Sequence, residues 1–218
     1  MISPAVTQFL QALDPASRDK ILAIKNPFQV QALLDEMPYV GEERNRSPLQ
    51  VMQDRQCHCL DGGLLGALAL NLIGFPPRII DLVPQPNTDD DHVLAIYQVD
   101  GFYGAVAKSN FSGLRFREPV YRTLRELAMS YFEVFFNIEG EKTLRAYTRP
   151  LNLMAFDRFN WSTHEQGVSV VTRRLYSLKP IPLINAAQAA RLSKMDERSY
   201  HTNMMGVNLE GLFKAPAH

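Results

Sequence analysis

The sequence has no excess of charge of either sign, because its 23 lysine and arginine residues are balanced by 23 aspartate and glutamate residues. A nucleic-acid partner or an anionic membrane surface is usually matched by a basic excess, so we expect neither here. The first residues, MISPAVTQFLQAL, contain no basic flank and no long apolar run. We therefore expect no secretory signal and no membrane anchor, and a cytoplasmic protein.

Cysteine is scarce: the chain has only Cys57 and Cys59, separated by His58. Residues this close in sequence are poorly placed for an unstrained disulfide. Zinc ligands usually come as C-x₂₋₄-C with a second pair elsewhere, and the sequence has no second pair. We therefore predict no metal and no other cofactor. A metal site made from this triplet and His92 is kept as an alternative.

Repeats and low-complexity tracts are also absent, and 46% of the 218 residues are hydrophobic. A chain of this length and composition can bury a substantial core. We expect one domain over residues 1–218, with a core over about 28–150 and a C-terminal extension over 151–218. The oligomeric state is not predicted by these features.

The stretch from Cys59 to Arg78, CLDGGLLGALALNLIGFPPR, has the pattern of a buried helix. Gly74 is a natural helix C-cap, and the two prolines that follow it prevent continuation. The apolar positions recur at helical spacing with small residues between them; they are Leu64, Leu65, Leu68, Leu72 and Ile73. Cys59 would begin this helix, where backbone N–H groups and the helix dipole stabilise a thiolate. Cysteine also often packs as a small hydrophobic residue, so an inert Cys59 is the alternative.

A second informative segment runs from His92 to Asn110. Two runs of β-forming residues flank the dipeptide Asp100-Gly101. Asp-Gly between such runs is a strong signal for an antiparallel hairpin. His92 opens the first run, directly after three aspartates.

The order of these features resembles the transglutaminase-like superfamily of papain-type thiol enzymes. Members of that family carry a nucleophilic cysteine at the start of a central helix, which ends in a Gly-x-Pro-x-Arg-like stretch, here Gly74 to Arg78. Their histidine opens a strand that leads to a turn. The resemblance covers roughly residues 49–110 and implies that Cys59, not Cys57, is the nucleophile and His92 its base.

The resemblance also implies an α+β fold of papain-like type. Its core would be a central helix packed on an antiparallel sheet, with N-terminal helices before it and a C-terminal α/β extension after it. An aspartate on the second hairpin strand orients the family's histidine, but the register places Ala107 there. A two-residue hairpin loop puts Ser109 opposite His92, whereas a three-residue loop puts Asn110 there. Because an asparagine amide can accept the histidine N–H, we prefer Asn110 as the third catalytic residue.

The chemistry implied is acyl transfer at an amide of a peptide or protein. His92 would take the thiol proton, the thiolate would attack the carbonyl carbon, and water or an amine would resolve the acyl-enzyme. The backbone N–H of Cys59 would supply one oxyanion donor. The alternative function is a catalytically inactive relative that acts as a binding module, supported by Ala107 in place of the orienting aspartate.

The remaining elements follow from capping and periodicity. Residues 4–39 are expected to be helical, with Asp14 and Asn26 as caps that each precede a proline. The polar stretch between Pro38 and Pro48 is expected to be a solvated loop. Further along, we expect a helix over 122–136, a strand over 167–176 and a helix over 185–195.

Overall fold

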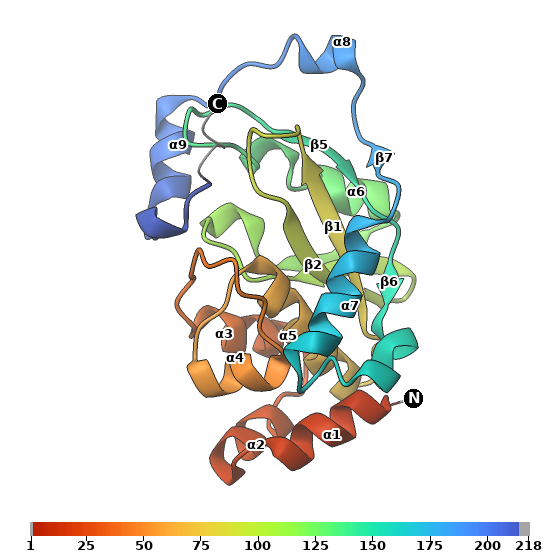
Figure 1. Cartoon of the computed structure of the whole chain (residues 1–218). Helices are drawn as coiled ribbons and strands as arrows, with labels where there is room; N and C mark the ends of the chain where they lie inside the picture. Colours follow the sequence, from red (N-terminus) through yellow and green to blue (C-terminus); the bar gives the residue numbers. More distant parts are fainter. Residues whose placement is uncertain (1, 214–218) are drawn as a thin grey trace.

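An antiparallel sheet runs through the middle of the molecule in a computed structural model that describes residues 2–213 (Figure 1). Its strand order is β4-β3-β2-β1-β5-β7, and β6 also pairs with β1. The strands are β1 (Arg78–Pro84), β2 (His92–Val99), β3 (Phe102–Val106), β4 (Arg117–Tyr121), β5 (Leu144–Tyr147), β6 (Leu151–Asn152) and β7 (Ile181–Pro182). Together with the helices this confirms the expected α+β class.

Along the chain, helices come before the first strand, between strands and after the last strand. The α-helices are α1 (Pro4–Ala12), α2 (Pro15–Leu22), α3 (Pro27–Asp35), α4 (Pro48–Asp54), α5 (Cys59–Leu72), α6 (Leu124–Met129), α7 (Glu165–Tyr176), α8 (Ala186–Ala189) and α9 (Glu197–Met204). The 3₁₀ turns are η1 (Ser112–Leu114), η2 (Phe132–Val134), η3 (Leu153–Phe159) and η4 (Leu209–Gly211). In the described part of the chain, none of these helices has the length and apolar character needed to cross a membrane.

The central helix α5 confirms the prediction made from its sequence. It begins at Cys59, and the backbone at Gly74 turns into the left-handed region with φ of +100°. The N–H of Phe75 then donates to Leu70 O at 3.0 Å, which closes the last turn. A Cβ at Gly63 would lie 2.7 Å from a methyl carbon of Val93, so this glycine lets α5 pack directly on β2.

Two hydrophobic clusters lie on opposite faces of the sheet. The larger cluster joins the sheet to α1, α3, α4, α5 and α7, and the smaller one joins it to α6 and η2. Along β2 the side chains alternate: Val93 and Ala95 point into the α5 cluster, whereas Leu94 and Ile96 point into the α6 cluster. Odd-numbered residues of β2 thus face α5 and even-numbered residues face α6, and this decides which side chains lie near the start of α5.

The N-terminal helices form as expected. Asp14 caps α2 by accepting from Ser17 N, and Asn26 caps α3 by accepting from Gln29 N. A proline follows each cap at the first helical position.

Three expectations for the later chain need correction. Residues 167–176 belong to the helix α7 and not to a strand, because their buried positions Val168, Val171 and Leu175 follow helical spacing. The helix expected over 122–136 is α6 followed by the short turn η2. The cap at Asn185 is confirmed, but the helix after it ends at Ala189.

Candidate active site

Cys59 lies in the wall of a cavity of about 490 Å³ at the start of α5. Its Sγ donates to the backbone oxygen of Asp91 over 3.6 Å. Tyr39 and Tyr176 line the same cavity together with several acidic residues, among them Asp91, so it combines the thiol with carboxyl groups and two phenols. Cys59 therefore lies beside a cavity that could hold a ligand, as a nucleophile requires.

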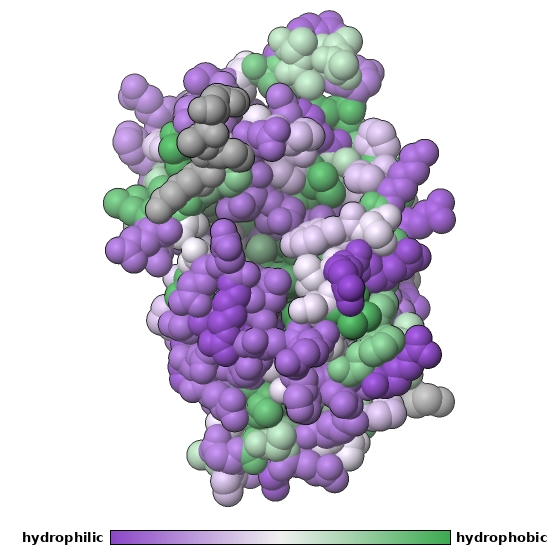
Figure 2. Space-filling view, in the orientation of Figure 1, coloured by the Kyte–Doolittle hydropathy of each residue, from purple (hydrophilic) through white to green (hydrophobic). Residues whose placement is uncertain are grey.

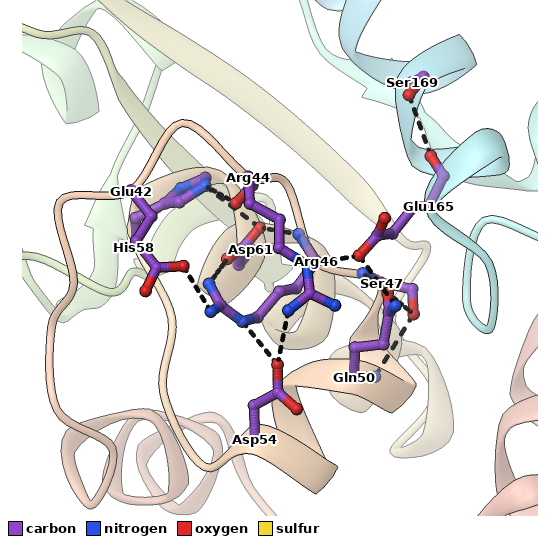
Figure 3. Close-up of polar contacts among 10 residues, drawn as sticks. All are labelled: Glu42, Arg44, Arg46, Ser47, Gln50, Asp54, His58, Asp61, Glu165 and Ser169. Carbon is purple, nitrogen blue, oxygen red and sulfur yellow. Dashed lines mark hydrogen bonds and ion pairs between the residues drawn. The ribbon is translucent and has the colours of Figure 1, made fainter.

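The first turn of α5 is fixed by the loop between α3 and α4 (Figure 3). Asp61 is fully buried, and its Oδ1 accepts from the backbone N–H of Arg46 at 2.7 Å. The Arg46 side chain pairs with Asp54 at 2.9 Å and with Glu42 at 2.6 Å. Arg46 is only 1% exposed, so the expectation of a simply solvated loop is wrong for this residue.

His58 and Arg44 complete this support. His58 Nδ1 accepts from Leu60 N at 3.2 Å as the N-cap of α5, and its Nε2 donates to Arg44 O at 3.1 Å. Burial lowers the pKa of His58 to about 4, so this ring is neutral at pH 7. Arg44 also pairs with Glu165 of α7 at 2.6 Å. In Figure 2 the face that carries this loop is dominated by hydrophilic side chains.

The predicted contact between Cys59 and His92 is not formed. His92 is a residue of even number on β2, so its ring points to the α6 face, away from α5. Its Nε2 donates to Leu114 O at 2.7 Å, and the rings of Tyr131 and Phe135 lie with their centroids 6.5 Å from it. Burial lowers the pKa of His92 to about 4, so the ring is neutral.

The predicted orienting residue also lies elsewhere. The hairpin expected at Asp100-Gly101 is present, and its turn has two residues, with φ of +49° at Asp100 and +85° at Gly101. This is the shorter of the two loops considered, not the one on which the preference for Asn110 depended. The strand pairing ends at Val106, before the register reaches Ser109. The amide of Asn110 bonds to the backbone of Asn208 instead of the histidine. The catalytic roles assigned to Cys59, His92 and Asn110 thus stay predictions, and the structure does not bring the three together.

Two carboxyl groups take the place beside the thiol that was expected for the imidazole. Asp91 precedes β2 and shares the α5 face with Val93, and Asp81 lies on the neighbouring strand β1. The two carboxyl groups influence each other's pKa, and the hydroxyl of Tyr176 lowers the pKa of Asp91. Burial, together with the charge of Asp91, raises the pKa of Asp81 well above its usual value. Burial also raises the pKa of Asp91, so both carboxyl groups are harder to ionise than an exposed aspartate.

The same environment keeps the thiol protonated. Burial is the largest cause that raises the pKa of Cys59 well above its usual value, and the carboxylate of Asp91 is the next. The backbone N–H of Val93 acts in the other direction but is outweighed. The helix N-terminus therefore does not produce a standing thiolate, contrary to expectation.

The alternative of a metal site finds no support in the geometry. Within residues 2–213, no three His, Cys, Asp or Glu side chains converge in a way that could hold a metal ion. Cys57 is fully buried, and burial raises its pKa to about 12. His58 is used as a helix cap, and His92 lies on the other face of the sheet.

Sequence reasoning missed Asp81, Asp91 and Tyr176. No short-range pattern identifies Asp91: it faces α5 because it lies two residues before Val93, whose side chain packs on Gly63. Tyr176 was missed because it reaches the site from α7, a segment that was expected to be a strand.

No protein-family model matches the chain, and no curated protein matches it. A solved structure of EGTA-treated LapG from Legionella pneumophila matches with a TM-score of 0.34 and 13% identity, over 48% of this chain and 68% of that chain. A second LapG structure matches with a TM-score of 0.33 and 12% identity, over 57% and 93%. LapG is a transglutaminase-like cysteine protease. A likeness at this level carries no argument about the activity of the present chain.

Proposed function

We propose that the protein is a transglutaminase-like thiol enzyme that hydrolyses or transfers an acyl group at an amide of a peptide or protein. Cys59 is the nucleophile, and Asp91, supported by Asp81, is its acid–base partner in place of His92. One observation carries this proposal: the thiol at the head of the central helix and the Asp91 carboxyl group line one cavity.

The electrostatics support a concerted proton transfer. Because the thiol is neutral, its proton must leave as the S–C bond forms. A buried carboxylate with a raised pKa is a stronger base than an exposed one, and Asp91 has such a pKa, raised mainly by burial. Strongly shifted carboxyl pairs in a cavity are a common feature of acid–base sites.

The reaction then proceeds in two balanced steps. Asp91 accepts the proton of Cys59 while the sulfur attacks the amide carbon, and the carbonyl oxygen becomes an oxyanion beside the backbone N–H at the start of α5. The C–N bond breaks as Asp91 returns the proton to the leaving amine. Water or a second amine then attacks the thioester, gives its proton to Asp91, and the thiol takes that proton back as it leaves.

A role for His92 as the base would need a different β2 register. A shift by one residue would turn His92 towards α5, but it would also remove Val93 and Ala95 from the larger core cluster. Removing two buried aliphatic side chains from the core would lower the free energy of unfolding, so we assign His92 a structural role.

A second candidate function is a binding module without catalysis. It is favoured by the raised pKa of Cys59 and by the position of His92 on the other face of the sheet. The imidazole of His58 lines the cavity with Cys59, but it is held as the N-cap of α5. In this case the cavity would hold a ligand, and the cysteine would take no covalent part.

An activated ester distinguishes the two functions without knowledge of the natural substrate. We expect p-nitrophenyl acetate to acetylate Cys59 in the full-length protein and to be turned over, as followed by nitrophenolate release and by mass spectrometry of the tryptic peptide. Cys59→Ser should abolish turnover, and Asp91→Asn should lower it by about 10²-fold, the usual worth of a general base. Cys57→Ser is the matched control, because Cys57 is buried.

The outcomes separate clearly. Unchanged turnover in Cys59→Ser would contradict the enzyme proposal. Unchanged turnover in Asp91→Asn, combined with loss in His92→Gln, would return the base to His92. If the wild-type protein is neither acetylated nor active, the binding module is the better description.

A further inference from the structure

The segment over residues 208–213 lies between two cavities. Gly211, Leu212 and Phe213 line the cavity that contains Cys59, and they also line a neighbouring cavity of about 230 Å³ that contains His92. The segment consists of Asn208, the turn η4 and two extended residues. It therefore forms part of the wall of both cavities.

Asn110 binds the backbone of this segment rather than its side chains. Its Oδ1 accepts from the N–H of Asn208 at 2.8 Å, and its Nδ2 donates to the O of Asn208 at 2.9 Å. The Nδ2 also donates to Gly211 O at 3.3 Å. One side-chain amide thus satisfies both backbone groups of one residue, as a neighbouring strand would. These bonds do not depend on which side chain the bound residue carries.

The loop after α3 lies on the other side of the segment, so Asn110 and this loop enclose residues 208–213 in a groove. Asn208 Nδ2 donates to Tyr39 O at 3.0 Å. A Cβ added to Gly211 would lie 2.9 Å from Cδ1 of the Tyr39 ring, and one added to Gly41 would lie 2.5 Å from Gly211 Cα. Only glycine fits this close to the Tyr39 ring, so a peptide bound in the groove needs a glycine at the position of Gly211.

The first half of the segment buries little side-chain surface. Leu209 is 70% exposed and Asn208 and Glu210 are exposed as well, whereas Gly211 is buried and Leu212 and Phe213 are half-buried. Segments with little apolar burial open locally at low free-energy cost. An external peptide with the same backbone groups can therefore compete for the groove.

We propose that Tyr39, Gly41 and Asn110 form a peptide-binding site, and that residues 208–213 are its internal ligand. The site takes a short peptide that places an extended residue against Asn110 and a glycine three positions later against Tyr39. Binding does not require chemistry at Cys59, so this proposal is independent of acyl transfer.

The test measures binding of a labelled peptide to full-length protein. The peptide is GVNLEGLF with an N-terminal fluorescein, which corresponds to residues 206–213, and the readout is fluorescence anisotropy. In the wild type the internal segment competes at a high effective concentration. In Gly211→Ala the added methyl group forces the internal segment off the Tyr39 ring, so we expect the peptide to bind at least about tenfold more tightly than to wild type. Leu209→Ala is the matched control and should behave as wild type.

Two further comparisons locate the binding contact. Adding Asn110→Ala to the Gly211→Ala chain should weaken peptide binding by about tenfold, because two to three hydrogen bonds are lost. A peptide methylated at the backbone nitrogen of its asparagine keeps every side chain but lacks the N–H that Asn110 accepts, and it should bind as weakly.

Several results would overturn the proposal. They are equal peptide affinity for wild type and Gly211→Ala, unaltered affinity after Asn110→Ala, or full binding of the methylated peptide. If Gly211→Ala misfolds by circular dichroism, Asn208→Pro serves instead, because proline removes the same N–H from the internal segment.

Discussion

Asp81 and Asp91 form a carboxyl pair on the α5 face of the sheet, one on β1 and one at the entrance to β2. Asp81 Oδ1 and Asp91 Oδ2 find no conventional donor among residues 2–213. A proton held between the two groups would satisfy both oxygens, and burial, followed by the charge of Asp91, raises the pKa of Asp81 in that direction. The pair lies next to Cys59, which is partly exposed, whereas Cys57 is buried.

The first prediction concerns the pH dependence of stability at Asp81. Its pKa is higher in the folded state than in the unfolded chain, so the folded state binds more protons and stability falls as pH rises above about 4. Asp81→Asn keeps a donor towards Asp91 but cannot ionise. Its thermal midpoint relative to wild type should therefore be higher at pH 8 than at pH 5. Asp100→Asn, in the exposed hairpin turn, is the control and should give no such difference.

How far the sequence predicts this site depends on the element. The start and end of α5 were predictable, because Gly74 and the prolines after it are local signals. The hairpin turn was predictable for the same reason, since Asp100-Gly101 suits positive φ at both positions. Both features are decided by residues adjacent in the chain.

The partners of Cys59 were not predictable by the same means. Asp91 and His92 are neighbours, so they face opposite sides of the sheet, and a register shift of one residue would exchange them. The packing of Val93 on Gly63 fixes the register in which Asp91 faces α5. Tyr176 joins the site only because α7 packs back onto the sheet. Such contacts are set by tertiary structure, which no short-range pattern contains.

The second prediction concerns His92 and acid. Its pKa is about 4 in the folded state, against the ordinary value of 6.5 for an exposed histidine, so below pH 6.5 the unfolded chain binds a proton that the folded chain does not. Stability should therefore fall as pH drops from about 6.5 to about 4, by up to about 3 kcal/mol from this residue. In His92→Gln, which can still donate to Leu114 O, the free energy of unfolding by urea should fall less steeply over this range. His58, also shifted to about 4, leaves a residual slope in both proteins.

The control for this measurement is His164→Gln, because His164 is exposed. It should keep the full slope of the wild type. An equal slope in wild type and His92→Gln would show that the His92 ring is not buried in its neutral form.

The third prediction concerns the buried ion pair below α5. Arg46→Met leaves Asp61 buried without its cationic partner, and breaking such a pair typically costs 3–5 kcal/mol. We expect a loss of about 3 kcal/mol in the free energy of unfolding by urea at pH 8. The matched control is Arg44→Met, because Arg44 pairs with Asp54 and Glu165 but is half exposed, and such pairs contribute about 0–1 kcal/mol. Equal losses in the two variants would contradict the structural role of Arg46.

The last prediction concerns the reactivity of Cys59. The carboxylate of Asp91 raises the pKa of the thiol, so Asp91→Asn should lower that pKa and speed alkylation at fixed pH. Each unit of decrease gives about a tenfold higher rate of reaction with iodoacetamide at pH 8, since the thiolate is the reactive species. His92→Gln should leave the pH profile unchanged, because the imidazole lies on the other face of the sheet. Tandem mass spectrometry of the tryptic peptide distinguishes Cys59 from the buried Cys57. A profile that shifts in His92→Gln and not in Asp91→Asn would show that the imidazole reaches the thiol in solution, and the acid–base assignment would then move back to His92.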